Sequence, residues 1–328
     1  MIPSEPRLVK LVKLIDALPE PPRPQTKRGR GREKTFTDKL FLKALVIMIV
    51  RRLSRVGELL SVLEQPTAEM QQLRELLTEN QRYPSRRTWE RRLAALPDTL
   101  PQQIGCLGRH LADLINPWKD CGRAVAIDST VLRACGGVWH KKDRETGTVP
   151  HTRIDTEAHW TKSGWHGWVY GWKLHLCCSV GPVWIPLAAD LTPANVADGE
   201  KAPDLIRELP LQPLFLLGDR HYNVASVSDA CFLRGYPLVT THYGKYPHSE
   251  AGVEVRRIFH KLRSTAIENF NEQFKAIFGA HDQVPSRGEV GTKRFALGAV
   301  LVYQLVLLYR YEQQMDLRVG LKPFVKAA

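Results

Sequence analysis

The chain has 328 residues, of which 43% are hydrophobic, and its 47 lysines and arginines outnumber 34 acidic residues, giving a net charge of +13. This length is sufficient for one large domain with a sizeable core and a smaller one. The six cysteines form no CxxC pair, which argues against a disulfide-stapled domain and a standard zinc site. No secretory signal is evident, so we expect reduced thiols in a cytoplasmic protein.

The positive charge is concentrated in the first third of the chain. Residues 1–110 hold 21 Lys and Arg against 12 Asp and Glu, a net charge of +9 (21 − 12). Basic side chains that neutralise phosphates release counterions, so this excess suggests a polyanionic partner. A basic surface kept for solubility is the alternative.

Helical patterns dominate this basic region. Residues 1–18 predict a short amphipathic helix that ends at the proline-rich segment 19–25, and residues 36–63 continue with helical periodicity. Between them, residues 27–34 predict a flexible basic arm suited to phosphate contact. The basic residues of the arm that we assign to DNA are Lys27, Arg28, Arg30 and Arg32.

A second helix with a strong basic character is expected at residues 83–96. Ser85 can cap it, and Trp89 and Leu93 begin an apolar stripe that would dock on its neighbours. Such a helix suits a DNA groove, although a solvated helix in an all-helical domain is the alternative. We assign residues 1–120 to an all-α, basic, DNA-binding region. The arginines on the exposed surface of the helix are Arg86, Arg87, Arg91 and Arg92.

The pattern changes after residue 120 to short apolar runs. Hairpin-linked strands followed by alternating helices and strands predict an α/β fold with a mixed five-stranded sheet flanked by helices, over residues 121–290. Residues 291–328 are expected to add a C-terminal core helix, since the apolar run 295–309 is too short for an ordinary membrane span. The five strands are expected at 123–130, 168–180, 184–191, 214–219 and 236–242.

Two aspartates follow apolar strands of this predicted sheet. If the strands that end in Asp128 and Asp219 are parallel neighbours, the two carboxylates lie roughly 5 Å apart at one sheet edge. Facing a phosphate backbone, such a pair requires divalent cations, and oxygen ligands favour Mg²⁺, with Mn²⁺ as the alternative. Asp190 also ends a strand, but one about two spacings or roughly 10 Å away, so we expect a structural role for it.

A third carboxylate is expected on the helical segment 263–275. Glu268 and Glu272 share its polar face, opposite an apolar face that contains Phe270 and Phe274. An alternative for Glu268 is purely structural, because Thr265 to Glu268 matches a capping box.

Five motifs in order, between residues 123 and 278, resemble the DDE transposases of bacterial insertion sequences, which have a ribonuclease-H-like catalytic core. The basic N-terminal segments GRGREKTFTD and PSRRTWERRL are similar as well, so most of the chain is covered. The motifs are AIDST, YGWKLHL, LTPANVADGE, LLGDRHYN and RSTAIENFNEQFK.

The resemblance implies that Asp128, Asp219 and Glu268 are the catalytic triad and hold two Mg²⁺ ions. Tyr222 matches an Asp-x-x-aromatic pattern of the family, and Tyr222 and Arg263 are expected among the DNA-binding residues. Lys275 matches the lysine of its tyrosine–arginine–glutamate–lysine signature, which contacts DNA at the transposon end. The spacing to Lys275 also selects Glu268 over Glu272.

The chain departs from the family pattern in two places. Four residues separate Arg263 from Glu268, where the family has three, and His260 stands where the tyrosine of the signature would fall. Only residues 243–267 lie between the fifth strand and Glu268, which leaves no room for the β-rich insertion of some relatives. A hairpin intermediate is therefore not assumed.

The implied function is DNA transposition: binding of terminal inverted repeats, cleavage at the ends by two-metal hydrolysis, and joining of the 3′-hydroxyl ends to target DNA. A homodimer on double-stranded DNA is expected, without a membrane, at the bacterial nucleoid. A catalytically inactive or domesticated DNA-binding relative and a structure-specific nuclease with the same core are the alternatives.

Several other polar and aromatic residues have two readings. Lys173 and His175 share one strand face and could approach DNA or simply pack. Four tryptophans around the first loop of the sheet could stack on flipped bases, but packing is the better interpretation of each. They are Trp139, Trp160, Trp165 and Trp168, and the histidines near them fit no standard zinc spacing.

Overall fold

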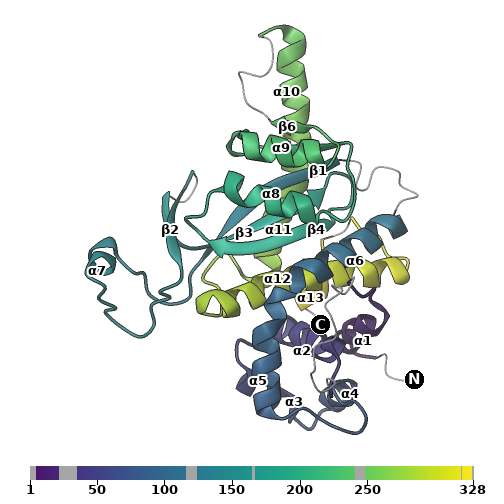
Figure 1. Ribbon diagram of the computed structural model, residues 1–328. Coiled ribbons are helices and arrows are strands. Elements are labelled where there is room, and N and C mark those ends of the chain that lie inside the picture. Colours follow the sequence, from purple (N-terminus) through teal and green to yellow (C-terminus); the bar gives the residue numbers. More distant parts are fainter. Residues whose placement is uncertain are drawn as a thin grey trace, which may run out of the picture.

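The structure is a computed structural model that describes residues 5–21, 35–115, 124–164, 167–240, 248–318 and 320–326 (Figure 1). The predicted basic arm at residues 27–34 lies outside the described residues. The N-terminal part is helical, as expected. Its helices are α1 (Arg7–Ala17), α2 (Asp38–Val50), α3 (Val56–Leu63), α4 (Ala68–Leu76), α5 (Arg86–Ala95) and α6 (Leu100–Ile115), with a 3-10 turn at Leu96–Asp98 before α6.

Helices α2 and α3 replace the single helical stretch expected at residues 36–63. The hydroxyl of Thr37 caps α2 by accepting a hydrogen bond from the amide of Leu40. The helix ends at Val50, and Arg52 takes a left-handed conformation with a φ of 56°, which turns the chain before α3 begins.

One mixed sheet forms the centre of the molecule. Its long strand β3 (Gly167–Ser179) pairs antiparallel with β1 (Ala124–Arg133) on one edge. The other edge of β3 pairs with β2 (His159–Ser163) and then β4 (Pro186–Pro193), both antiparallel. Strands β5 (Phe215–Gly218) and β6 (Leu238–Thr240) extend the sheet parallel to β1.

This strand order confirms the mixed α/β, ribonuclease-H-like sheet that the resemblance implies. Within the described residues the sheet has six strands in place of the expected five, because β2 was not expected. Its residues lie in the loop that the sequence pattern left without structure, and β2 gains its order from pairing with the start of β3.

The remaining helices either lie beside the sheet or extend away from it (Figure 1). Helix α8 (Asp198–Glu208) lies between β4 and β5 in the chain, and α9 (Ala225–Leu233) lies between β5 and β6. A 3-10 turn at Arg220–Tyr222 precedes α9. A long helical segment follows, made of α10 (Glu250–Arg263), a π-helical turn at Ser264–Glu268 and α11 (Asn269–Phe278). The shortest helices are α7 (Lys141–Glu145), in the loop between β1 and β2, and α13 (Lys322–Lys326).

Helix α12 (Gly288–Glu312) is the predicted C-terminal core helix. It packs on β4 and α6 and also contacts α2, so the apolar cores of the helical region and the sheet are continuous. Among the described residues it is the one helix long and apolar enough to cross a membrane, but most of that stretch is buried inside the protein. Its buried Gln304 donates hydrogen bonds to the carbonyls of Ile104 and Pro186, each at 2.8 Å.

Candidate active site

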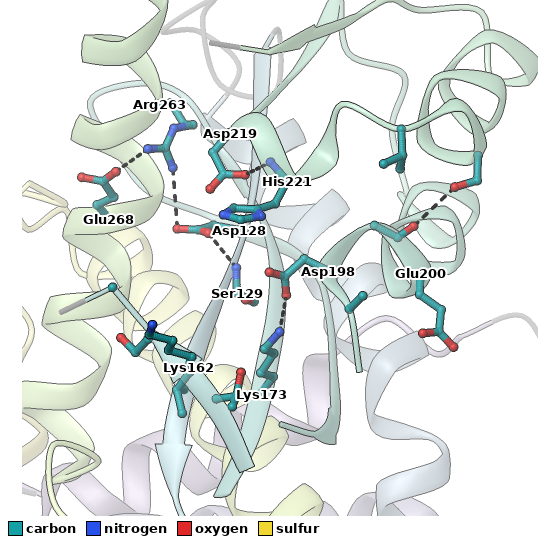
Figure 2. Close-up of a pocket in the computed structure, with 18 residues that line it drawn as sticks. Asp128, Ser129, Lys162, Lys173, Asp198, Glu200, Asp219, His221, Arg263 and Glu268 are labelled. Atoms are coloured by element: carbon teal, nitrogen blue, oxygen red, sulfur yellow. Dashed lines mark hydrogen bonds and ion pairs between the residues drawn. The ribbon is translucent and has the colours of Figure 1, made fainter. Parts of the chain in front are cut away.

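Asp128 and Asp219 are brought together by the parallel pairing of β1 and β5. Val125 pairs with Leu216 and Ala126 with Leu217, so the same register continued by two residues sets Asp128 beside Asp219. Figure 2 shows the two carboxylates pointing into one pocket. This confirms the juxtaposition expected of the two strands.

The sequence pattern suggested that Asp128 ends its strand, but in the structure the strand continues beyond it. Strand β1 continues to Arg133 because its other edge pairs with β3 over the whole length. Strand β5 ends at Gly218, so from Asp128 onward the edge of β1 that faced β5 is no longer paired with it. The backbone amide of Ser129 donates a 2.8 Å hydrogen bond to the Asp128 carboxylate, and the amide of His221 donates one of 2.8 Å to Asp219.

The environment of Asp128 disfavours its negative charge. Burial raises the pKa of Asp128 to about 7, although its side chain keeps 20% of its exposure. The guanidinium of Arg263 and the Ser129 amide act in the opposite direction, while the carboxylates of Asp219 and Asp198 raise the pKa further. A cluster of this kind is stabilised by any cation that enters it.

Arg263 provides such a cation from the neighbouring helix. Its Nη2 atom lies 2.5 Å from Oε1 of Glu268, and its Nη1 atom lies 3.7 Å from Oδ2 of Asp128. Only 7% of Arg263 is exposed. The arginine therefore bridges two of the three carboxylates assigned to the triad (Figure 2).

The π turn explains how Arg263 reaches Glu268 across one residue more than the family pattern has. In an α-helix each residue turns by about 100°, so residues i and i+5 lie about 140° apart. The π turn at Ser264–Glu268 is closed by an i to i+5 hydrogen bond and is wider than an α-helical turn, which brings both side chains to the same face. The π turn accommodates the extra residue, so Arg263 and Glu268 still lie on one helix face and form an ion pair.

The capping-box interpretation of Glu268 is wrong. The residue lies within a helical segment that is continuous from Glu250 to Phe278, where no helix begins. Its carboxylate binds Arg263, and the hydroxyl of Thr265 donates backward to the carbonyl of Lys261. Glu268 is thus directed toward the pocket.

The pocket between these residues has a volume of about 790 Å³ and is also lined by Asp198 and Lys173. The Nζ atom of Lys173 lies 3.2 Å from Oδ1 of Asp198 and 3.0 Å from the carbonyl of Val196. Lys173 therefore faces the pocket, but its charge is paired within the protein. Whether it contacts DNA stays a prediction.

Asp198 is a site residue that sequence reasoning missed. It is the first residue of α8, and it lies close enough to Asp128 to raise the pKa of that carboxyl. A signal was available, because Asp198 opens a predicted helix within the motif LTPANVADGE. No strand of the sheet carries Asp198, so only the packing of α8 brings it to the pocket.

His175, on the same strand face as Lys173, is buried at 2% exposure and cannot approach DNA. Its Nε2 atom forms a 2.8 Å hydrogen bond with the hydroxyl of Thr192, and its Nδ1 atom lies 3.7 Å from Asp198. Burial lowers the pKa of His175 to about 4. The packing alternative for this residue is therefore confirmed.

Tyr222 is a correction to the expected DNA contacts. It is 1% exposed, and its ring packs on Gly218, where an added Cβ would lie 2.9 Å from the Cβ of Tyr222. The side chain is part of the core under the carboxylates and presents no surface to DNA. Gly218 is thus explained by the close approach of Tyr222.

Lys275 lies on α11 on the side of the site. Burial lowers the pKa of Lys275, and the carboxylates of Glu272 and Asp128 oppose that shift. The lysine is therefore within electrostatic reach of Asp128. Its contact with DNA stays a prediction.

The arginines of α5 divide into two groups. Trp89 and Leu93 are buried and Ser85 caps the helix, as expected. Arg86, Arg87 and Arg91 are exposed, Arg86 with an ion pair to Glu90 on the same helix. Arg92 is different, because it pairs with Asp38 and lies 4.3 Å over the ring of Phe41, tying α5 to α2. The charge of Arg92 is thus paired within the protein, and its contact with DNA stays a prediction.

Asp190 has the structural role expected of it. Its carboxylate is paired with Lys201 at 2.7 Å and with Lys293 at 2.9 Å. Both ion pairs lower the pKa of Asp190 against the effect of burial. The residue joins β4 to α8 and α12.

The donors at the site suit a hard divalent cation. Asp128, Asp219 and Glu268 offer oxygen ligands alone, the set that Mg²⁺ and Mn²⁺ prefer. Within the described residues, however, no three His, Cys, Asp or Glu side chains are already arranged to hold a metal. In this arrangement the carboxylate of Glu268 is paired with Arg263.

Comparisons with known proteins agree with the sequence motifs. Residues 119–305 match the family model described as a transposase DDE domain. The comparison with curated protein sequences returned no match.

Solved structures give weaker similarities. A piggyBac transposase synaptic complex with hairpin DNA is 11% identical, with a TM-score of 0.41, over 98% of this chain and 75% of that one. A Mos1 transposase paired-end complex with the left transposon end is 15% identical, with a TM-score of 0.22, over 88% and 80%. TM-scores this low carry no argument about function.

Proposed function

The chain belongs to the transposase DDE family, and from this premise we propose that it binds the ends of its own DNA element, cleaves them and joins them to target DNA. The observation that carries the proposal is the convergence of Asp128, Asp219 and Glu268 on one pocket, around the guanidinium of Arg263.

Asp128, Asp219 and Glu268 would hold two divalent ions, Mg²⁺ or Mn²⁺. Bound there, the ions would supply an activated attacking oxygen and stabilise the leaving oxygen of a phosphodiester. To become a ligand, Glu268 must exchange its ion pair with Arg263 for the metal. Arg263 would then remain beside the pocket as a donor for a phosphate oxygen.

The reaction needs no protein nucleophile. Water attacks the phosphodiester at the element end, and the 3′-hydroxyl that is released attacks the target strand at the same carboxylates. Each step exchanges one oxygen on phosphorus for another, so the bonds balance without a covalent intermediate.

DNA recognition is assigned to the basic N-terminal part. The exposed arginines Arg86, Arg87 and Arg91 on α5 would contact phosphates or a groove, with the basic arm at residues 27–34 and Lys275 nearer the cleaved end. A homodimer that holds two ends is proposed because both must be cut together. The expected location is the nucleoid of the bacterial cytoplasm.

The test is incubation of the protein with the inverted repeats that flank its gene, with Mg²⁺ or with EDTA, scoring both cleavage and joining. Metal-dependent cleavage followed by joining supports the proposal. End binding without cleavage points to an inactive relative, and cutting of branched DNA without end preference points to a structure-specific nuclease.

A further inference from the structure

The chain between β1 and β2 forms an arm, residues 134–158, that carries α7 and extends away from the sheet (Figure 1). The arm is ordered by its own contacts. The indole of Trp139 donates to the carbonyl of Thr148 at 2.8 Å, and the indole of Trp160 on β2 donates to the carbonyl of Trp139 at 3.0 Å. Its shape is therefore built in before any partner binds.

An open pocket of about 690 Å³ lies between this arm and the hairpin of β2 and β3. Its walls are aromatic and its rim is basic. The lining residues are His140, Lys141, Arg144, Glu145, Trp160 and Trp168.

Trp168 is the unusual member of the pocket. Along β3, Trp172 and Tyr170 share its face and are buried, while Trp168 is 68% exposed. Trp160 packs against Tyr170 with their ring centroids 5.4 Å apart. The aromatic stripe of the core thus continues into the pocket and ends on an uncovered indole, a surface suited to a flat aromatic ligand.

The hairpin places this pocket next to the carboxylate site. Trp168 pairs with Lys162 across the hairpin, and Thr161 and Ser163 lie on the opposite strand face from Trp160. Thr161, Lys162 and Ser163 all line the active-site pocket. A DNA strand held at Asp128 would therefore run close to the hairpin edge that separates the two pockets.

We propose that the arm pocket binds an unstacked nucleobase of the DNA that is held at the carboxylates, with the base stacked on Trp168. Lys141, whose exposed ammonium group lies 3.7 Å from Glu145, is the rim cation that meets the adjacent phosphate. The ligand class is an unpaired nucleotide, because the pocket joins an aromatic face to a positive rim. The proposal rests on the proposed function, since it requires DNA at the carboxylates.

The first test measures the affinity of the full chain for oligothymidine by fluorescence anisotropy. Trp168→Ala should weaken binding about fivefold or more, and Trp168→Phe should retain most of it. Phe232→Ala removes another exposed aromatic, on α9 outside the arm, and should leave binding unchanged. Because Trp168 is exposed, the thermal unfolding of Trp168→Ala should match that of the wild-type protein.

The second test places 5-iodouracil at each position near the cleaved end of the inverted repeat and maps the photo-crosslinks. One position should crosslink to Trp168, and this crosslink should disappear in Trp168→Ala while gel-shift binding persists. Unchanged oligothymidine binding in Trp168→Ala, or ends that are bound without any crosslink to Trp168, would overturn the proposal.

The two tests separate this proposal from the transposase function. If the inverted repeats are neither bound nor cut, the proposed function fails. Oligothymidine binding that still depends on Trp168 would then support the pocket as a nucleotide site by itself.

Discussion

Arg263 and Glu268 stand five residues apart in the sequence and form an ion pair of 2.5 Å on one helix face, because the turn between them is π-helical. An α-helical turn of the same length would direct the two side chains about 140° apart. The turn thus keeps the arginine between two carboxylates of the site despite the additional residue.

Deleting Thr265 should be tolerated. This exposed residue lies in the π turn, so its removal lets the turn become α-helical while α10 and α11 keep their faces. Cleavage of element ends and the thermal midpoint should stay close to wild type. Deleting the exposed Glu272 from the α-helical part is the matched control, and it should unfold the protein by rotating Phe274 and Ile277 out of the core. Equal damage from both deletions would contradict this account of the turn.

Arg263→Ala should destabilise the metal-free protein by about 1–3 kcal/mol, because it leaves Asp128 and Glu268 without their shared cation. Added Mg²⁺ should then stabilise the variant more than it stabilises the wild-type protein, since the ion meets no competing guanidinium. Urea unfolding with and without Mg²⁺ measures both effects. The same Mg²⁺ response in the two proteins would argue against a shared position for arginine and metal.

Asp128→Asn, Asp219→Asn and Glu268→Gln should each lower cleavage of element ends by roughly a thousandfold or more while binding of the ends persists. Gel shift and a cleavage assay on the same DNA measure the two properties. Asp190→Asn is the matched control, because its carboxylate pairs with Lys201 and Lys293 away from the pocket. It should affect stability more than the rate per folded molecule. If cleavage survives all three substitutions, Asp128, Asp219 and Glu268 are not the catalytic residues.

The buried His175 should make folding sensitive to mild acid. The pKa of His175 falls from an unfolded value near 6.5 to about 4 in the folded protein, so the unfolded chain takes up the proton first. Stability is therefore fully present above pH 6.5 and is lost as the pH falls toward 4, by at most about 1.4 kcal/mol per pH unit. His175→Gln should show a shallower pH dependence of its urea unfolding free energy over this window. An identical dependence in the variant would show that other groups cause the acid sensitivity.

Arg91 and Arg92 are adjacent on α5 and should respond in opposite ways. Arg91→Ala should weaken DNA binding and lower the salt slope by about 1, if this exposed residue neutralises one phosphate. Arg92→Ala should instead lower the thermal midpoint, because Arg92 ties α5 to Asp38 and Phe41. Salt-dependent anisotropy and thermal unfolding separate the two. A normal salt slope in Arg91→Ala would exclude Arg91 from the DNA interface.

Local sequence patterns predict most strands of the sheet and two of the three triad residues, Asp128 and Asp219. The apolar runs before Asp128 and Asp219 predict strands by themselves, and the alternation along β3 predicts which of its residues face the core. These features depend on neighbours within a few residues, where hydrophobic periodicity is a direct consequence of strand and helix geometry. The general rules for how consecutive strands and helices connect then suffice to predict that β1 and β5 are parallel neighbours.

Side-chain surroundings could not be predicted in this way. Tyr222 sits beside two polar residues in the sequence, yet the ring is buried on Gly218. Asp198 opens a helix like many other aspartates, and only the packing of α8 against β3 brings it to the carboxylates. Arg92 looks like its neighbours on α5 until Asp38, 54 residues earlier, pairs with it.

The sequence by itself determined five of the six strands of the described sheet, the apolar faces of its helices and the carboxylates offered to the site, because each depends on residues adjacent along the chain. The tertiary structure decided which charges are paired, which aromatics are covered and where Glu268 points. Pairing and burial are set by residues far apart in the sequence, and at Glu268 a one-residue change in helical register would rotate the side chain by about 100°.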